Sequence, residues 1–365
     1  MTYQEKRSIL PSWLWRSETI PLLWSWPFVS LLPSLCLWKR YFFYREIITG
    51  VKNEFDIGGI LIKVVAATKY GSPEVLRLIE IDKPVPKDNE ILIKVYATTI
   101  NAGDSRMRSF NVPFVLWLPA RIALGLRKPE NPILGMELAG IVESVGKHVT
   151  RFKPGDRVFG ATSHANFGAH AEYKCLSEDG PVLNIPDNVT YEKAATLSIG
   201  ATTALYFLKK GHIQSGQQVL INGASGSVGT FSVQLAKYYG AEVTGVCSTA
   251  NVELVKSLGA DNVIDYTQVD FTRNGEAYDI IFDTVGKSSL SQCKSSLKKN
   301  GSYLNTLRGG TAVIRNEDLD LLIDLVATNR LTPVIDRCYP LEQVVEAHRY
   351  VDQGHKKGNV VITLA

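Results

Sequence analysis

The chain has 365 residues, which is enough for two domains with separate hydrophobic cores. Charged residues make up 21% of it and hydrophobic residues 45%, and the formal net charge is only +4, as in an ordinary globular protein. The basic residues are scattered along the chain, so nothing favours nucleic-acid binding. The five cysteines form no CxxC pair, which argues against a disulfide framework and predicts a reducing, cytoplasmic location.

The start of the chain differs in kind from the rest. Residues 20–38 are uncharged and apolar, near the lower limit of about 17–25 residues for a membrane span. Pro21, Pro27 and Pro33 would interrupt a helix there, and no small-residue cleavage site follows. We therefore interpret residues 1–59 as a poorly ordered or anchoring N-terminal extension. Membrane association through residues 20–38, with a membrane-associated or organellar location, is the less favoured alternative.

From residue 60 onward the pattern becomes regular. Strand-like segments joined by tight turns predict a β-rich first domain, and they lie at 60–66, 91–97, 140–146 and 152–159. Residues 191–211 then look helical. Strands and helices alternate after residue 216, which predicts a parallel sheet with strands at 218–221, 242–246, 262–264, 279–282 and 301–304. The fold class is therefore α/β.

The segment 219–250 carries the most specific local signal. An apolar run leads into a small-residue turn, a helical pattern and a second β-rich run, the first unit of a dinucleotide-binding fold. The turn consists of Ala224, Ser225, Gly226, Ser227, Val228 and Gly229. Gly226 would let the backbone approach a pyrophosphate, and Gly229 would let the helix pack close to the strand. Ala224 replaces the first glycine of the pattern, so an ordinary glycine-bearing turn is the alternative.

The end of the second strand bears on the choice of nucleotide. An NAD-selective fold usually has an Asp or Glu there, roughly 20 residues after the turn. Here the first carboxylate is Glu253, whereas Ser248, Thr249 and Asn251 can donate hydrogen bonds to a 2′-phosphate. The pattern therefore favours NADP(H) over NAD(H), although Ala250 leaves the loop without a cation to pair with that phosphate.

A β-rich domain followed by a doubly wound domain resembles the medium-chain dehydrogenase/reductase superfamily, and within it the zinc-independent, quinone-oxidoreductase-like branch. The resemblance covers about residues 63–363, and its motifs lie at 69–76, 101–104, 135–140, 152–159, 224–229 and 282–286. It implies a GroES-like catalytic domain at 60–186 that residues 331–365 complete. It also implies a Rossmann cofactor-binding domain at 187–330, with the cofactor in the cleft between the two.

Zinc-dependent members of the superfamily bind their catalytic metal through a Cys near the 101 segment and a His in a Gly-His-Glu motif. The matching stretch here is Gly135-Met136-Glu137, and no Cys lies between Cys36 and Cys175. Zinc prefers thiolate and imidazole ligands, so we expect no metal site. The remaining candidates lie in predicted turns without a ligand-like spacing: His148, His164, His170 and Cys175.

Without a Lewis acid, reduction of an electron-poor acceptor is favoured over oxidation of an alcohol. We expect NADPH to reduce a quinone or an α,β-unsaturated carbonyl by hydride transfer. The resemblance implies that Asn101 and Asp104 line the substrate side and that Thr203 lies near the nicotinamide. A capped turn is the alternative role for Asn101 and Asp104. Tyr70 and solvent are both possible proton donors.

The segment around Asp283, Val285 and Gly286 fits a strand end that faces the adenine half of the cofactor, with Asp283 as a cap or buried acceptor. Relatives carry a longer stretch than residues 305–316, where segment 311–314 could still supply a short edge strand of a homodimer interface. Two other functions stay open. One is a cofactor-binding structural or regulatory protein with little turnover, and the other is a zinc-dependent alcohol dehydrogenase.

Overall fold

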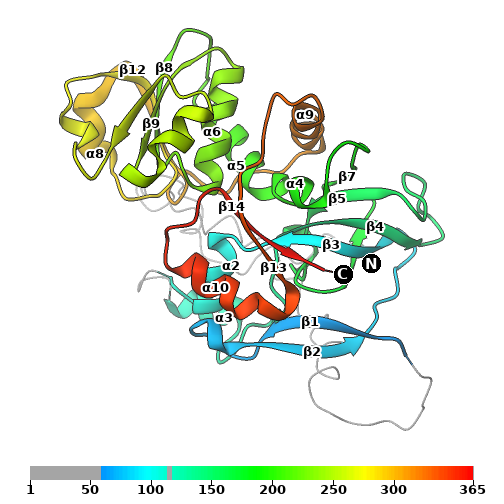
Figure 1. Ribbon diagram of the computed structural model, residues 1–365. Helices are drawn as coiled ribbons and strands as arrows, with labels where there is room; N and C mark the ends of the chain where they lie inside the picture. The colour runs from blue at the N-terminus through cyan, green and yellow to red at the C-terminus, as the bar shows by residue number, and fades with distance from the viewer. Residues whose placement is uncertain (1–58, 113–116, 365) are drawn as a thin grey trace, which may run out of the picture. The chain divides into compact units, whose positions relative to one another are not determined.

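The structure is a computed structural model that describes residues 59–112 and 117–364 (Figure 1). The predicted N-terminal extension, apart from Gly59, lies outside these residues, and so does Cys36. None of the helices formed by the described residues is long and apolar enough to cross a membrane.

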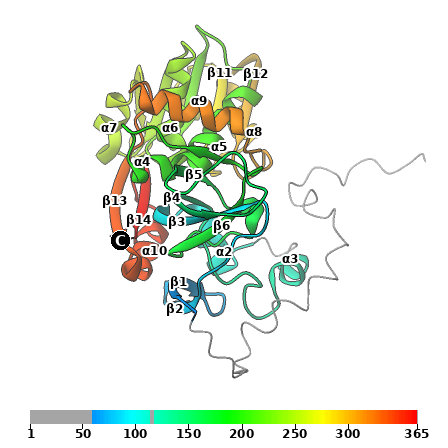
Figure 2. The ribbon, with the colours of Figure 1, turned by 90° about the vertical axis from the view of Figure 1, so that its right-hand side faces the viewer.

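A seven-stranded sheet makes up the β-rich part. Its strands are β3 (Glu90–Thr99), β4 (Glu137–Val145), β5 (Arg157–Ala161), β6 (Tyr173–Ser177), β7 (Val182–Asn184), β13 (Ile335–Pro340) and β14 (Asn359–Thr363). They follow the order β13-β14-β3-β4-β5-β7, and β6 also pairs with β3. The end of the chain thus returns to this sheet, where β14 lies beside β3 in both views (Figures 1 and 2).

A hairpin and several helices pack around that sheet. The hairpin consists of β1 (Leu61–Ala67) and β2 (Leu76–Asp82), and the helices are α2 (Ala102–Ser109), α3 (Trp117–Leu124) and α10 (Val344–Asp352). The side chains of β3 are buried along most of its length, because the strand lies inside the sheet. Ile91, Ile93 and Val95 belong to a core that also includes Val344 and Ala347 of α10.

The second sheet has five strands, and every pair in it is parallel. They follow the order β10-β9-β8-β11-β12, with β8 at Gln218–Asn222, β9 at Glu242–Cys247, β10 at Asn262–Asp265, β11 at Tyr278–Asp283 and β12 at Leu297–Asn305. All five predicted strands are present, and the α/β fold class is confirmed. Because the strand order reverses beside β8, the carboxyl ends of β8 and β11 form the position at which such sheets bind ligands.

Helices connect and cover the parallel strands. They are α4 (Tyr191–Ala195), a π-helical turn (Leu197–Ala201), α5 (Thr202–Lys210), α6 (Ser227–Tyr238), α7 (Val252–Ser257), α8 (Leu290–Cys293) and α9 (Asn316–Ala327). Phe207 of α5, Phe231 of α6 and Leu322 of α9 share one core with Phe282 of β11.

One predicted element is missing from the described residues. Segment 311–314 forms no strand, so β12 ends the sheet on that side. The carbonyl oxygen of the Asn305 side chain accepts hydrogen bonds from Leu307 N (2.8 Å) and Arg308 N (3.1 Å). Gly310 then adopts a left-handed φ of +95°. These turns lead the chain away from the sheet edge before a sixth strand can pair. The predicted domain limits stay predictions.

Candidate active site

The glycine turn after β8 is tighter than the sequence pattern indicates. Gly223 has a left-handed φ of +83°, and a Cβ there would lie 2.3 Å from a methyl carbon of Val285. Gly223 therefore makes the tight turn that the motif normally assigns to the position of Ala224. Ala224 itself is fully buried, and its N–H donates to Val246 O at 2.9 Å. Sequence analysis missed Gly223 because a left-handed φ leaves no signal beyond the residue type.

The other two glycines of the turn have different surroundings. A Cβ on Gly229 would lie 2.1 Å from Gly223 O, so α6 can approach β8 only with glycine there. A Cβ on Gly226 would meet only Gly223 O, at 3.5 Å, and the space beside Gly226 is otherwise open. Gly226 is also the N-cap of α6, with no side-chain cap. The first amides of α6 therefore face an open cradle, which fits a phosphate group.

The loop after β9 is more engaged than predicted. The Asn251 side-chain amide donates to the hydroxyls of Ser225 and Ser248, both at 3.2 Å. The Thr249 hydroxyl donates to Asp265 Oδ2 at 2.5 Å. Hydrogen bonds from Thr249 and Thr267 lower the pKa of Asp265, so its carboxylate carries a negative charge. Asp265, at the end of β10, thus places a carboxylate beside this loop, although the loop sequence itself has none before Glu253.

The Asp283 carboxylate organises the loop after β11. It is fully buried and accepts hydrogen bonds from Val285 N (3.0 Å), Gly286 N (2.9 Å) and Ser288 N (2.8 Å). Asn222 and Asn305 also donate to it. Asp283 therefore acts here as a buried acceptor that shapes the loop, whereas the exposed Val285 side chain lies beside Gly223 where the strand order reverses.

Asn101 and Asp104 form a capping box at the start of α2. The side-chain oxygen of Asn101 accepts from Gly103 N at 2.7 Å, and Asp104 Oδ2 accepts from Asn101 N at 3.0 Å. Asp104 Oδ1 accepts from Gly135 N at 3.0 Å, and burial raises the pKa of this carboxyl. Asp104 therefore joins the start of α2 to the segment at Gly135 by hydrogen bonds. The Asn101 side-chain nitrogen is buried and has no acceptor among the described residues, so it can donate to a ligand.

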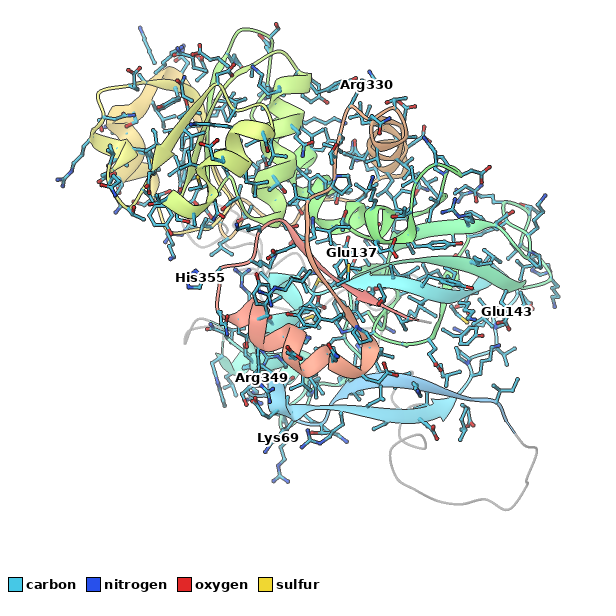
Figure 3. All side chains as sticks on the ribbon, viewed as in Figure 1. Lys69, Glu137, Glu143, Arg330, Arg349 and His355 are labelled. Carbon is cyan, nitrogen blue, oxygen red and sulfur yellow. The ribbon has the colours of Figure 1, made fainter. Side chains whose placement is uncertain are left out.

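Glu137 on β4 is a buried acid that sequence analysis did not assign to the site. Its carboxylate accepts from the Thr99 hydroxyl at 2.5 Å and from Ile199 N, in the π-helical turn, at 2.7 Å. Burial raises the pKa of Glu137 to about 8. Figure 3 labels this residue, which joins the seven-stranded sheet to the turn before α5.

The π-helical turn also contacts the glycine loop. A Cβ on Gly200 would lie 2.5 Å from the Ser227 hydroxyl, so the two segments touch. Thr203 follows in the first turn of α5 and is partly exposed. The structure therefore brings the segment of Thr203 together with the glycine loop and Glu137.

The histidines of the predicted turns differ in burial, and the hydroxyl of Tyr70 has a hydrogen-bond partner. His170 lies in a bend but is fully buried, and its Nε2 lies 3.0 Å from Thr99 O because the segment packs between Leu134 and Val65. His148 and His164 are exposed, as turn residues usually are. The Tyr70 hydroxyl donates to Leu124 O at 2.6 Å, so its proton is engaged in the described structure.

Comparison with known proteins identifies the family. The family described as "Alcohol dehydrogenase GroES-like domain" matches residues 87–187, and two families, both described as "Zinc-binding dehydrogenase", match residues 227–306 and 306–362. The bovine "NAD(P)H oxidoreductase RTN4IP1, mitochondrial" is 32% identical over 91% of this chain and 96% of its own. The human "Quinone oxidoreductase" is 30% identical over 81% of this chain and 96% of its own. The chain belongs to the quinone-oxidoreductase-like branch of the medium-chain dehydrogenase/reductase superfamily.

Another relative and a solved structure agree with this family assignment. The tomato "2-methylene-furan-3-one reductase" (Solanum lycopersicum) is 33% identical over 82% of this chain and 79% of its own. The solved quinone oxidoreductase from Coxiella burnetii superposes with a TM-score of 0.76 at 28% identity, covering 84% of this chain and all of that one. The protein is therefore an NAD(P)H-dependent oxidoreductase with a GroES-like part, a Rossmann sheet and a small-molecule substrate.

The described residues of this oxidoreductase fit a nicotinamide cofactor. The open cradle at Gly226 and the amides of α6 would hold the pyrophosphate, and the bound cofactor would supply the hydride. Within residues 59–112 and 117–364, no group of three or more His, Cys, Asp or Glu side chains is arranged to hold a metal ion. Zinc independence remains a prediction.

Proposed function

We propose that this oxidoreductase reduces an electron-poor acceptor, a quinone or an α,β-unsaturated carbonyl, by zinc-independent hydride transfer from the nicotinamide. The observation that carries the proposal is the place of Met136. By resemblance, this residue stands where zinc-dependent relatives have their histidine ligand. Its thioether packs against the first turn of α2, since a Cβ on Gly103 would lie 2.7 Å from Met136 Cε.

An amide donor, in place of a metal, supports the acceptor in this proposal. Asn101 caps that same first turn, and its buried side-chain nitrogen has an open donor position. A donor aimed at an acceptor oxygen stabilises the negative charge that forms there as hydride arrives. A quinone or enone is already polarised, so orientation and exclusion of water supply most of the remaining help.

The nucleotide preference has evidence on both sides. Strand β9 ends at Cys247 and is followed by Ser248, without a carboxylate, which favours NADPH as the sequence predicts. Asp265 of the neighbouring strand binds Thr249 in the same loop and opposes a 2′-phosphate by its charge. The preference for NADPH therefore stays a prediction, as do the homodimer and the cytoplasmic location.

Turnover assays with both nucleotides test the proposal. We expect NAD(P)H oxidation with a panel of quinones and enones at an unchanged rate in the presence of a chelator. Activity that chelator abolishes and zinc restores would establish an alcohol dehydrogenase instead. Tight cofactor binding without turnover on the whole panel would establish a structural or regulatory protein.

A matched variant isolates the amide donor. Asn101→Asp keeps the oxygen that caps α2 but removes the nitrogen donor, so we expect an intact fold. The kcat/KM should fall by about 100-fold, as when an oxyanion donor is removed elsewhere. A kcat/KM within threefold of the wild type would mean that Asn101 only caps the helix.

A further inference from the structure

The segment between α10 and β14 lies across the glycine loop. Gly358 N donates to Ser225 O at 2.8 Å, and Gly358 forms a parallel bridge with Gly226. One residue later, the Ser227 hydroxyl donates to Asn359 Oδ1 at 2.6 Å. Figure 3 labels His355, which lies within this segment. The end of the chain thus reaches the same turn that forms the open cradle.

Lys356 is a partly buried cation within this segment. Its ammonium donates to Gly358 O at 2.5 Å. Gly358 therefore binds both Lys356, through its oxygen, and Ser225 of the glycine loop, through its nitrogen. An ammonium has three donors, and this hydrogen bond uses one of them. Burial lowers the pKa of Lys356 to about 8, and the charges of Asp336 and Glu137 act in the opposite direction. Removal from water makes the ammonium a strong partner for an anion.

The ammonium of Lys356 donates to Gly358 O and to neither of the two acids that influence its pKa. Asp336 Oδ2 accepts from the Tyr350 hydroxyl at 2.6 Å and from Lys357 N at 2.9 Å. Both oxygens of Glu137 accept from Thr99 and Ile199, as described above. Lys356 thus lies two residues before Gly358 and is held by it, the residue that contacts the glycine loop, with donors left for a further partner.

We propose that Lys356 is a cofactor-binding residue whose ammonium pairs with a phosphate of the dinucleotide on the glycine loop. The amides at the start of α6 supply partial positive charges, and Lys356 supplies a full positive charge at the same turn. The pairing needs the nicotinamide cofactor but does not depend on the acceptor proposed above.

Titration calorimetry with NADH, NADPH and ADP-ribose, without any acceptor, tests this role. Lys356→Gln should raise the Kd for all three about 10- to 100-fold, the range expected for a charge-assisted hydrogen bond. Lys356→Arg should restore most of the affinity because the charge returns. The matched control is Lys357→Gln, which removes the neighbouring exposed lysine and should change the Kd less than twofold.

Salt and thermal unfolding separate this role from that of an internal counter-ion. The difference in Kd between the wild type and Lys356→Gln should shrink as salt rises, because an ionic contact with the ligand is screened. A variant that unfolds at a lower temperature yet binds all three ligands with wild-type Kd would overturn the proposal. Equal weakening by Lys356→Gln and Lys357→Gln would also overturn it, since general attraction by surface charge would then suffice.

Discussion

The Glu137 carboxylate lies 2.7 Å from the backbone nitrogen of Ile199, and this hydrogen bond joins β4 to the π-helical turn before α5. The second carboxylate oxygen lies 2.5 Å from the Thr99 hydroxyl. The acid is therefore held from both the seven-stranded sheet and the helical turn that contacts the glycine loop. A buried acid with two donors is costly to remove, because each donor would stay in the interior without a partner.

Replacement of Glu137 should reveal that cost. We expect Glu137→Ala to lower the free energy of unfolding by about 2–4 kcal/mol, since it leaves two buried donors unpaired. Glu137→Gln can still accept from Ile199 and donate to Thr99, so its loss should stay below about 1 kcal/mol. Urea denaturation of both variants is the measurement, and equal losses would show that the hydrogen bonds contribute little.

Stability should also fall with rising pH because of Glu137. Its pKa is raised from 4.5 to about 8 in the folded protein, so the folded state holds this proton more tightly than the unfolded state. The resulting stabilisation is fully present below pH 4.5 and is lost as pH rises toward 8. The wild type should lose up to about 1.4 kcal/mol per pH unit in this window relative to Glu137→Gln. Parallel pH profiles for the two proteins would contradict the raised pKa.

The two glycines of the turn should separate binding from folding. Gly226→Ala adds a methyl group to an open cradle at φ −80°, so the fold should keep its melting temperature while the Kd for NAD(P)H rises at least about 10-fold. Gly229→Ala places its methyl 2.1 Å from Gly223 O and should cost about 2 kcal/mol or more of stability. Thermal melts and calorimetry on both variants check this, and wild-type affinity in Gly226→Ala would place the phosphate elsewhere.

Asp265 should bias the choice of nucleotide. Asp265→Asn keeps an oxygen for Thr267 but removes the charge beside Thr249, so affinity for NADPH relative to NADH should rise about 3- to 10-fold. The control is Glu253→Gln, which removes an exposed carboxylate that pairs with Lys256. An unchanged ratio of the two Kd values in Asp265→Asn would show that its charge does not reach the 2′ position.

Local pattern predicted much of the fold. Short apolar runs predict all five parallel strands, and the signal is strongest in β8, β9 and β11, which are buried on both faces. The predicted helix after the glycine turn is present, and it begins at Ser227, so the last three residues of the predicted turn belong to its first turn. These strands and this helix are predicted well because their signals come from residues close together in the sequence.

The residues that sequence analysis missed are placed by contacts between distant segments. Asp265 meets Thr249 only because β9 and β10 pair in parallel, with Cys247 opposite Asp265. Glu137 meets Ile199 across 62 positions. Gly358, which holds Lys356, contacts the glycine loop only because β14 enters the sheet beside β3. The hydrophobic periodicity of a single segment contains no information about which distant segment it contacts.

The position of β14 determines when the seven-stranded sheet can be completed during synthesis of the chain. This strand is the last in the sequence, yet it lies between β13 and β3, and the residue before it binds Ser225. During translation, the interior position between β13 and β3 therefore stays open until β14 leaves the ribosome. A stop codon just before Gly358 would remove an interior strand together with the segment that binds the glycine loop.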